Sequence, residues 1–519
     1  MKHAAFLLSL CVASASASVA GAGSVVVTID TQAEPRPISD FIYGSNHEVE
    51  GHMFRAARRL GGNRLSAYNW RIDASNAGKD YRHNSDQWLT RQTWWQATAG
   101  ARPVRVADDK AGAVHRFHEE SLARGSYSLV TVPLAGFVVA DADGPVEASE
   151  ATPSRRWTEV EDGQAFTRHL VDTYGGAGNA RGIRGFSLGN EPALWHKTHP
   201  RMRREAVTCE ELLQRSVRTA QAIKRADADA EVFGPALWGM TAYASLSKAT
   251  DWPAEKKRGG YDWFIDAYLD RMSQASERAG VRLLDVLDVH WYTEAPKGRE
   301  WTGEEAARSA KALYDAKHTE PNWVGKHFGD FLPLLPRLQE SIDRYYPGTK
   351  IAITEYDWPM TGTVYGGLTQ ADALGAFGKH GVYFASYHHY THDKPDRYVG
   401  SAFALYRNYD GQGASFGRLA LPATVDGMGD ADFDVYASTD SESGAVHVVV
   451  IHRGEGEARP VELRLDGMDT ALTGRTFYFD ADSPDVRPGP PLESDSDGSV
   501  TLSVPTLSAW HVVLTLSEK

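Results

Sequence analysis

The stretch Gly185-Phe186-Ser187-Leu188-Gly189-Asn190-Glu191-Pro192 places a short strand-like run directly before turn residues and a carboxylate. Seven other short apolar runs between residues 36 and 415 have this strand-like character, and helical patterns lie between them. These runs are Phe41–Gly44, Asn63–Ser66, Tyr127–Val132, Glu231–Gly234, Val286–Trp291, Lys350–Thr354 and Val382–Tyr387. Eight strands that alternate with helices predict an α/β fold, a (β/α)8 TIM barrel rather than a doubly wound sheet.

Beyond residue 416 the pattern changes to short runs in which apolar and polar residues alternate, with turn-rich stretches between them. The runs are Asp434–Thr439, Val446–His452, Arg459–Leu465, Thr476–Phe479, Ser499–Val504 and Ala509–Thr515. This pattern predicts a smaller antiparallel β-sandwich domain at the C-terminal end. Because Val25–Ile29 is an expected extra strand of it, we expect residues 24–35 and 416–519 to form the sandwich and residues 36–415 to form the barrel.

The first residues of the chain are of a different kind. Lys2 and His3 precede a short apolar run and then a tract of serine and alanine, which predicts a secretory signal peptide over residues 1–20. The apolar run is too short to span a bilayer, so we expect a secreted, extracellular protein without a membrane anchor. Cys11 would leave with the signal, and Cys209 would then be the single cysteine, so no intramolecular disulfide is expected.

Charge and aromatic content narrow the range of partners. The 519 residues include 55 basic and 68 acidic ones, and the net charge of −13 argues against a nucleic-acid partner. The chain has 14 Trp and 22 Tyr, more than core filling usually needs, and flat rings are what sugar-binding clefts use. An aromatic-rich core is the alternative interpretation. Nothing in the sequence implies a protein partner.

Two glutamates follow predicted strands of the barrel, Glu191 after the fourth and Glu355 at the end of the seventh. Reactive residues of such barrels lie at the C-terminal ends of the strands. Two carboxyl groups across a cleft are the minimum equipment for cleaving a glycosidic bond, since one gives a proton while the other attacks or activates water. Either glutamate alone would fit an ion pair, but together they predict a catalytic pair.

Neighbouring strand ends offer supporting groups. His290 and Tyr292 lie on one face of the sixth strand and are expected to hydrogen-bond Glu355 or the sugar. The alternative for His290 is a buried ring bonded to a backbone carbonyl. Arg64, placed at the end of the predicted second strand, is expected to keep the nucleophile ionised, with a structural ion pair as the alternative.

Four tryptophans follow predicted strand ends and are candidate stacking platforms for sugar rings, although packing inside a loop is an equally good explanation for any single one. They are Trp195, Trp238, Trp291 and Trp358. The cluster of His388, His389, His392 and Asp393 is not expected to bind a metal, because neighbours on a strand point in alternate directions. Glu48 and Glu50 are among the loop acids that leave room for a structural Ca²⁺, but no metal site is predicted, and the reaction requires no cofactor.

Three longer motifs carry a family resemblance. Gly61–Trp70 with the nearby Ala74–Gly78, then Asn190–Pro200, and finally Tyr406–Gly411 resemble glycoside hydrolase family 44, over a region from about Pro37 to the C-terminus. The resemblance implies a (β/α)8 barrel with a β-sandwich and an endo-acting β-1,4-glucanase, several members also acting on xyloglucan. It also implies that the anomeric configuration is retained.

At matching positions, the resemblance makes Glu191 the acid/base and Glu355 the nucleophile. Asn190 is expected to hydrogen-bond the sugar 2-hydroxyl, and Tyr68 belongs to the first motif as a substrate-binding or supporting residue. The sequence departs from the family pattern at Gly189, where similar members usually carry Asp, so the pH optimum is open to a shift. Enzymes for mannan or xylan, and a non-catalytic carbohydrate-binding barrel, are the alternatives to a β-glucan hydrolase.

Overall fold

The computed structural model describes residues 24–46, 56–81, 83, 89, 110–140, 157–159, 163–388, 396–427, 430–440, 443–454, 456–467, 471–496 and 498–516. The predicted signal peptide, Glu48, Glu50, and the histidines and aspartate at His389, His392 and Asp393 lie outside this part of the chain. Within it, no helix is both long enough and apolar enough to cross a membrane.

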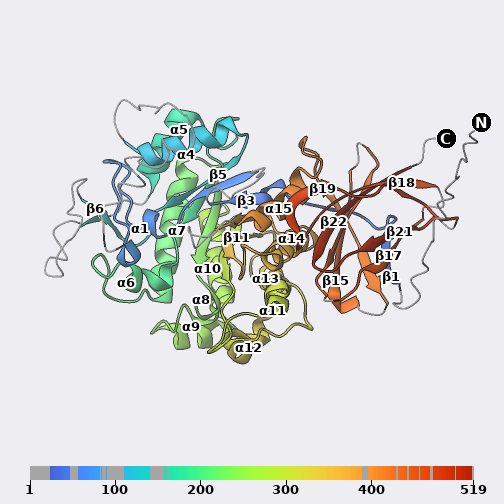
Figure 1. Cartoon of the computed structure of the whole chain (residues 1–519). Helices are drawn as coiled ribbons and strands as arrows, with labels where there is room; N and C mark the ends of the chain where they lie inside the picture. The colour runs from blue at the N-terminus through green and yellow to red at the C-terminus, as the bar shows by residue number, and fades with distance from the viewer. Residues whose placement is uncertain are drawn as a thin grey trace, which may run out of the picture.

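Eight parallel strands close into a barrel, which confirms the predicted fold class (Figure 1). Their order around the barrel is β10-β11-β12-β3-β4-β5-β8-β9. The strands are β3 (Gly44–Ser45), β4 (Ala57–Leu60), β5 (Tyr127–Val132), β8 (Gly185–Leu188), β9 (Glu231–Leu237), β10 (Val286–Tyr292), β11 (Lys350–Asp357) and β12 (Phe384–Tyr387).

The larger helices around the barrel are α4 (Gly112–Ala123), α5 (Gln164–Tyr174), α7 (Cys209–Ala226), α8 (Met240–Ser245), α9 (Trp252–Gly259), α10 (Phe264–Ala279), α11 (Gly303–Ala307), α12 (Trp323–Phe328), α13 (Leu334–Tyr345), α14 (Val364–Lys379) and α15 (Arg397–Arg407). Helix α7 shows why these segments are helical. The Thr208 side chain accepts the Glu211 N–H at its start, acids fill its first turn and bases its last turn. Leu212, Ala220 and Ile223 are among its buried residues, so one face packs on the barrel.

One end of the barrel is filled with apolar side chains. Residues from six strands form a single buried cluster, and each is among the first three residues of its strand: Ala57, Tyr127, Leu129, Phe233, Val286, Ala352 and Phe384. The N-terminal end of the barrel is therefore closed by packing. The polar residues at the C-terminal ends of the strands face the open end.

The prediction for the second strand was wrong. Asn63–Ser66 forms a short helix, α1, and the barrel strand is β4, Ala57–Leu60. The strand was missed because it contains Arg58 and Arg59, and charged residues are rarely buried without partners. Both are buried here because each has a carboxylate partner. At the first strand, Asp40–Tyr43 forms a 3₁₀ turn, and only Gly44–Ser45 is strand.

The C-terminal part folds into two packed sheets, as predicted. The larger has the order β19-β18-β22-β16-β15-β13-β2, with β20 beside β18, and the smaller has the order β14-β1-β17-β21. Their strands are β1 (Val25–Asp30), β2 (Arg36–Pro37), β13 (Leu419–Leu421), β14 (Ala423–Asp426), β15 (Phe433–Thr439), β16 (Val446–His452), β17 (Arg459–Asp466), β18 (Leu472–Asp480), β19 (Ser483–Pro488), β20 (Leu492–Glu493), β21 (Val500–Val504) and β22 (Ser508–Leu516). We call these sheets the β-domain.

The N-terminal strand β1 lies in the β-domain, pairing antiparallel with β14 and parallel with β17. The next strand, β2, also pairs into this domain, with β13, although the sequence analysis assigned Arg36 to the barrel. The division of the chain at residues 36 and 416 stays a prediction.

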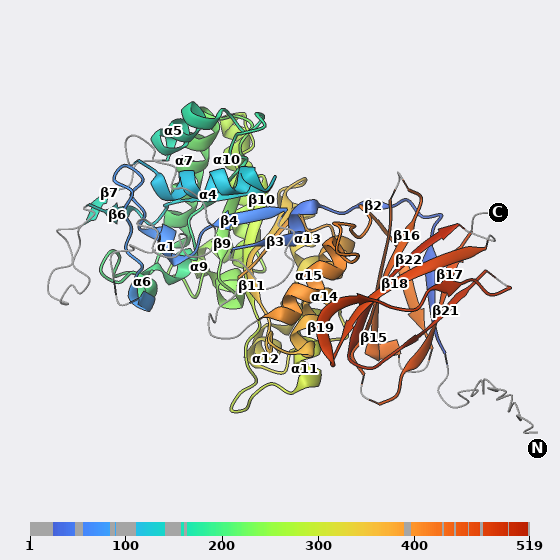
Figure 2. The same ribbon diagram turned by 45° about the horizontal axis from the view of Figure 1, so that its top comes forward.

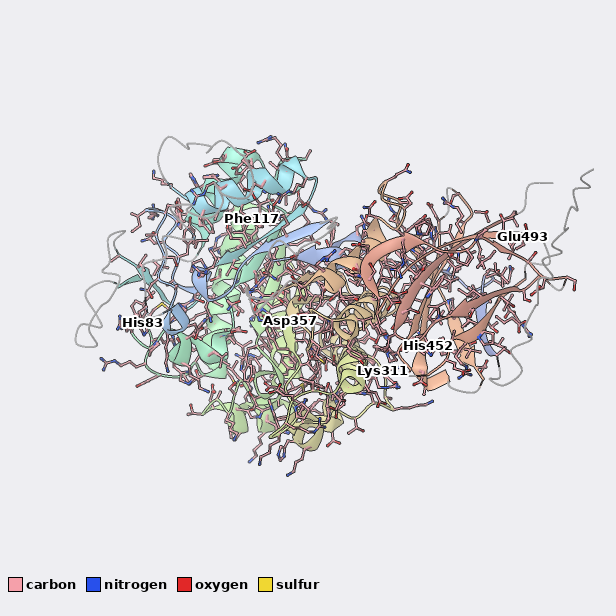
Figure 3. The ribbon with its side chains drawn as sticks, viewed as in Figure 1. His83, Phe117, Lys311, Asp357, His452 and Glu493 are labelled. Carbon is pink, nitrogen blue, oxygen red and sulfur yellow. The ribbon has the colours of Figure 1, made fainter. Side chains whose placement is uncertain are left out.

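The barrel and the β-domain lie side by side in both views, with α14 and α15 at the junction (Figures 1 and 2). The side chain of Asp372 on α14 is fully buried there. It accepts hydrogen bonds from Tyr314 (2.8 Å) and Tyr436 (2.5 Å) and pairs with Arg453 at 3.1 Å. Arg453 also pairs with Asp434, which Lys311 contacts at 3.0 Å from the barrel side (Figure 3). A buried network of charges therefore joins the two parts.

Replacing Arg453 with Leu is expected to destabilise the protein by about 3–5 kcal/mol, because the fully buried carboxylate of Asp372 and the partly buried one of Asp434 would lose their shared cation. The matched control is Arg397→Ala, which breaks an exposed pair with Asp485 across the same junction (3.2 Å). That change should cost no more than about 1 kcal/mol. Urea unfolding followed by tryptophan fluorescence measures both, and equal losses would show that the network does not hold the junction.

Candidate active site

Glu191 and Glu355 meet at the open end of the barrel. Glu355 lies within β11, whose last residue, Asp357, is labelled in Figure 3. Glu191 follows β8 after a two-residue turn, and its N–H donates to the Ala236 carbonyl at 3.0 Å. Carboxylate oxygens of the two glutamates lie within 4.8 Å of each other. Glu191 has a φ of +43°, a strained value for a residue with a side chain and one that is concentrated at functional sites.

Three side chains surround the Glu355 carboxylate. Arg59 Nη1 donates to Oε1 at 2.6 Å, and the Tyr292 hydroxyl donates to Oε2 at 2.7 Å. His290 Nδ1 lies 3.5 Å from Oε2. Burial alone would raise the pKa of Glu355, but the positive charges of His290 and Arg59 outweigh it and hold that pKa well below its ordinary value. Glu355 is therefore ionised and suited to act as a nucleophile.

Glu191 has the opposite electrostatic environment. Burial raises the pKa of its carboxyl, and the negative charge of Glu355 raises it further, against the hydrogen bond from His290. His290 Nδ1 lies 3.1 Å from Glu191 Oε1, so the ring lies between the two carboxylates. Although burial lowers the pKa of His290, the charge of Glu355 reverses the effect and the net shift is upward. Two neighbouring carboxyls with pKa values moved in opposite directions form an acid and nucleophile pair.

The cation on the nucleophile is Arg59 and not the predicted Arg64. Arg64 lies in α1, because the strand that precedes the motif ends at Leu60. The signal for Arg59 was present in the sequence, since side chains alternate along a strand. Arg58 points to the outside and pairs with Glu120 on α4 at 3.2 Å, whereas Arg59 points into the barrel.

Arg59 also fixes Asn190. Its Nη2 donates to Asn190 Oδ1 at 2.8 Å, and Asn190 Nδ2 donates to Asn63 Oδ1 at 3.3 Å. The Trp195 indole N–H donates to the Asn190 carbonyl at 2.8 Å. The side chain that sequence analysis assigned to the sugar 2-hydroxyl is thus held beside the nucleophile by the same guanidinium.

Asp288, which the sequence analysis did not select, lies beneath the pair and is fully buried. It accepts hydrogen bonds from Ser187 on β8 (3.2 Å) and Thr354 on β11 (2.6 Å). It therefore ties its own strand, β10, to the strands that carry the two glutamates. Asp288 could have been predicted from the sequence, because it lies two residues before His290 and therefore on the same face of the strand.

Four of the predicted aromatic residues are buried in the protein: Trp195, Trp291, Trp358 and Tyr68. Trp195 and Trp358 have 1% and 4% of their surface exposed, and the Trp358 indole N–H donates to Gln370 at 2.9 Å. The turns after the strands fold both indoles into the core, so neither has an exposed ring face to support stacking on sugar, and that role stays an untested prediction. Tyr68 donates to Asp73 at 2.6 Å, and Asp73 also accepts the N–H of Ala113 at the start of α4, so that a role of Tyr68 in substrate binding stays a prediction.

Trp238 and Trp291 do line a recess beside the site, together with Tyr292 and a tryptophan that sequence analysis missed, Trp323. Trp238 is partly exposed, and its indole N–H donates to Ser247 at 3.0 Å. Trp323 begins α12, far along the chain from the end of β10, so its position does not follow from a strand end. That Trp238 and Trp291 contact sugar stays a prediction.

Within the described residues, one group of histidine and carboxylate side chains is compact enough to share a metal ion, and it is the trio of Glu191, His290 and Glu355. The guanidinium of Arg59 already supplies a positive charge to this trio at 2.6 Å. Glu48 and Glu50, which are among the loop acids that leave room for a structural Ca²⁺, lie outside the described part of the chain.

The chain is similar to known proteins of one family. The sequence model of glycoside hydrolase family 44 matches residues 158–295. Endoglucanase A of Paenibacillus lautus is 41% identical over 524 residues, which cover 95% of this chain and 73% of that protein. The chain belongs to glycoside hydrolase family 44, and it is therefore a glycoside hydrolase.

Two other similar proteins differ in the activity that their names give. The solved structure of a Paenibacillus polymyxa xyloglucanase with xyloglucan has a TM-score of 0.87 and 38% identity, and the match covers 95% of this chain and all of that one. The β-mannanase/endoglucanase A of Caldicellulosiruptor saccharolyticus is 35% identical over 95% of this chain, which spans 39% of the length of that protein.

Replacing Tyr292 with Phe is expected to lower kcat by about 10- to 100-fold, since it removes a hydrogen bond to a charged group. The acid limb of the pH profile should move to higher pH, because the phenol lowers the pKa of Glu355. Initial rates from pH 3 to pH 8 measure both effects. Tyr365→Phe is the control, as that ring lies at α14 away from the pair. A lower kcat with an unmoved acid limb would contradict the assigned contact.

Proposed function

We propose that the protein is a retaining, endo-acting β-1,4-glucanase that cleaves cellulose-type glucans and xyloglucan. The observation that carries this proposal is the carboxyl pair, whose oxygens lie within 4.8 Å and whose pKa values move in opposite directions. Retaining enzymes place their carboxyls about 5–5.5 Å apart, whereas inverting enzymes need about 6.5–9.5 Å to admit a water. The relatives named as endoglucanase and xyloglucanase support the substrate class.

The reaction takes two steps. In the first, a Glu355 oxygen attacks the anomeric carbon as the glycosidic bond breaks, and Glu191 gives its proton to the departing oxygen. In the second, Glu191 takes a proton from water, the water oxygen attacks the anomeric carbon, and the bond to Glu355 breaks. Two inversions give net retention. Asn190, held by Arg59, is positioned to bind the 2-hydroxyl of the reacting sugar.

The charge of Glu355 helps Glu191 to change from acid to base between the two steps. In the first step, the negative charge of Glu355 helps keep the Glu191 proton in place. That charge is lost when the glycosyl bond forms, so the pKa of Glu191 falls as it becomes the base. No step requires a metal or organic cofactor, and we propose that the enzyme uses none.

Gly189 replaces the aspartate that the family resemblance leads one to expect before Asn190. Its φ is +74°, and a Cβ there would lie 2.9 Å from Leu134 Cβ, so a side chain would require the neighbour to shift. The raised pKa of Glu191 therefore arises from burial and from Glu355, with no carboxylate at position 189.

The pH profile of kcat/KM is expected to be bell-shaped. Activity requires ionised Glu355, whose lowered pKa places the acid limb below the ordinary range of glutamate. It also requires protonated Glu191, so activity falls as pH rises through the raised pKa of that group. Rates on a neutral soluble glucan from pH 3 to pH 9 check this. An alkaline limb at the ordinary pKa of glutamate would contradict the assignment.

Reducing-end release tests the proposed function. The substrates are carboxymethylcellulose, xyloglucan, lichenan, mannan and xylan, with Glu191→Gln and Glu355→Gln as matched inactive variants. We expect release from the glucans with an early loss of viscosity, and NMR should detect the β-anomer first. Release from mannan alone would favour the activity named for the Caldicellulosiruptor relative. Binding without release from any polymer would instead favour the carbohydrate-binding alternative.

We also propose that the protein is secreted. This rests on the sequence pattern of residues 1–20. Expression of the full chain in a bacterial host, followed by N-terminal sequencing of protein from the medium or periplasm, is the test. An N-terminus near residue 18 or 21 is expected, and retention of Met1 inside the cell would contradict it.

A further inference from the structure

Asn46 is a polar residue at the open end of the barrel that is not among the site residues proposed from the sequence. It directly follows β3, and its backbone N–H donates to the Tyr387 carbonyl at the end of β12 at 2.8 Å. Its side-chain Nδ2 donates to the Thr354 carbonyl of β11 at 2.9 Å and to the Ser386 hydroxyl of β12 at 2.8 Å. Asn46 is therefore fixed between β3, β12 and the strand that carries the nucleophile.

These partners determine how the side-chain amide of Asn46 is oriented. Carbonyl oxygens accept hydrogen bonds and do not donate them, so the amide nitrogen must face the carbonyls of Thr354 (2.9 Å) and Ser386 (3.2 Å). The amide oxygen, Oδ1, is then directed to the other side, where Arg59 Nη1 lies at 3.3 Å. Asn46 therefore presents a fixed acceptor to the guanidinium group of Arg59.

The orientation of the Arg59 guanidinium depends on a small number of acceptors. Within the described residues, Nη1 donates to Glu355 Oε1 at 2.6 Å and to Asn46 Oδ1 at 3.3 Å. Nη2 donates to Asn190 Oδ1 at 2.8 Å, and the buried Nε has no hydrogen-bond partner in the described structure. The side chain of Arg59 is completely buried. Its position beside the nucleophile therefore rests on three acceptors, and two of them share Nη1.

The relative strength of the two Nη1 contacts changes during a two-step reaction. Before the first step, the contact with the ionised Glu355 is the stronger one, because hydrogen bonds between charged groups are shorter and stronger. When Glu355 bonds to the anomeric carbon, its carboxylate becomes a neutral ester, and this contact weakens. Asn46 Oδ1 is then the acceptor that keeps Nη1 in place. In the second step the bond to Glu355 breaks, its electron pair returns to the carboxylate, and negative charge develops again beside Arg59.

We propose that Asn46 is a positioning residue that holds Arg59 beside Glu355 while the glycosyl-enzyme exists, so that it speeds the second step more than the first. This inference rests on the proposed function and adds a residue to its mechanism. Without the Asn46 amide, the charge of Glu355 would still hold Arg59 before the first step. Once Glu355 is an uncharged ester, the guanidinium would have lost both acceptors of Nη1 at their full strength, and hydrolysis of the intermediate would slow.

Kinetics of Asn46→Ala on an aryl cellobioside with a good leaving group test this inference. On such a substrate kcat/KM reports the first step, while kcat reports the slower second step. We expect kcat to fall about tenfold, the effect of losing one hydrogen bond to a charged group. The value of kcat/KM should stay within about threefold of the native one, so KM should fall as well. Mass spectra of acid-quenched protein should show a larger fraction of glycosyl-enzyme than in the native protein.

Asn408→Ala is the matched control. Asn408 is a buried asparagine at the end of α15, and its Oδ1 accepts the Gly413 N–H at 2.6 Å. Its loss should leave kcat and kcat/KM within about twofold of the native values. The amplitude of the phenol burst counts the folded, competent sites, so a variant that folds poorly is corrected for. Equal falls of kcat and kcat/KM in Asn46→Ala, or an unchanged kcat, would overturn the inference.

A double variant shows whether Asn46 acts through Arg59. When Arg59 is already Met, Asn46→Ala should lower kcat by less than about threefold, because the group that it positions is gone. A further tenfold loss would mean that Asn46 acts independently of Arg59, and would overturn the inference. Failure of the proposed function gives a different result. A native enzyme with neither burst nor turnover would contradict the retaining mechanism itself, whereas an active native enzyme with an unchanged second step in Asn46→Ala contradicts the inference alone.

Discussion

Replacing Glu355 with Gln should lower kcat on every polymeric substrate by at least about 10⁴-fold, because no covalent glycosyl intermediate would form. Glu191→Gln should cost about 10²–10⁴-fold on polymers, the usual contribution of a general acid. The two variants should differ on an aryl cellobioside with a good leaving group. Such a leaving group needs no proton, so the first step remains fast in Glu191→Gln, whereas Glu355→Gln stays inactive.

A burst of released phenol measures this difference directly. Glu191→Gln should show a burst followed by slow turnover, since its intermediate forms but lacks a base for hydrolysis. Added azide should speed that turnover and give a β-glycosyl azide. A burst in Glu355→Gln and none in Glu191→Gln would reverse the assigned roles.

Replacing Arg59 with Met should have the next largest effect. The change would remove one of the two positive charges beside the buried carboxylate of Glu355, and breaking a buried ion pair costs about 3–5 kcal/mol. It would also release Asn190, whose side chain Arg59 holds at 2.8 Å. We expect kcat to fall by at least about 100-fold and the acid limb of the profile to move to higher pH, because Arg59 lowers the pKa of Glu355.

Arg58→Met is the control for that experiment. Arg58 is the preceding residue of β4, is similarly buried and pairs with Glu120 on the outside of the barrel. Its loss should lower the free energy of unfolding but leave the acid limb in place. Equal shifts of the acid limb in both variants would show that the effect comes from the strand and not from the guanidinium. Urea unfolding and pH profiles are required for both proteins.

The strands that the sequence predicted best contain no charged side chain. The ranges Tyr127–Val132 and Gly185–Leu188 match β5 and β8, because these strands are buried on both faces and contain no charge. The second strand was missed because Arg58 and Arg59 make it look exposed. Their burial depends on Glu120 and Glu355, which lie far away in the sequence, so no local pattern reveals it.

Some residues of the site could be predicted from the sequence and others could not. The positions of Glu191 and Glu355 follow from strand ends, and so do those of His290 and Tyr292 on one face of β10. Whether a tryptophan side chain is buried or exposed does not follow from a strand end, because it depends on how the loop after the strand packs on the core. For this reason Trp195 is buried under Asn190 while Trp238 reaches the recess.

The charged network around Asp372 has a consequence for attempts to use the catalytic part alone. A chain shortened at residue 415 would lose Arg453, Asp434 and Tyr436, and α14 would then expose an unpaired carboxylate to solvent. The strand β1 at the other end would lose both of its neighbours. Exchanging or trimming the β-domain would therefore destabilise the barrel as well. The smallest useful unit for engineering is residues 24–516 kept together.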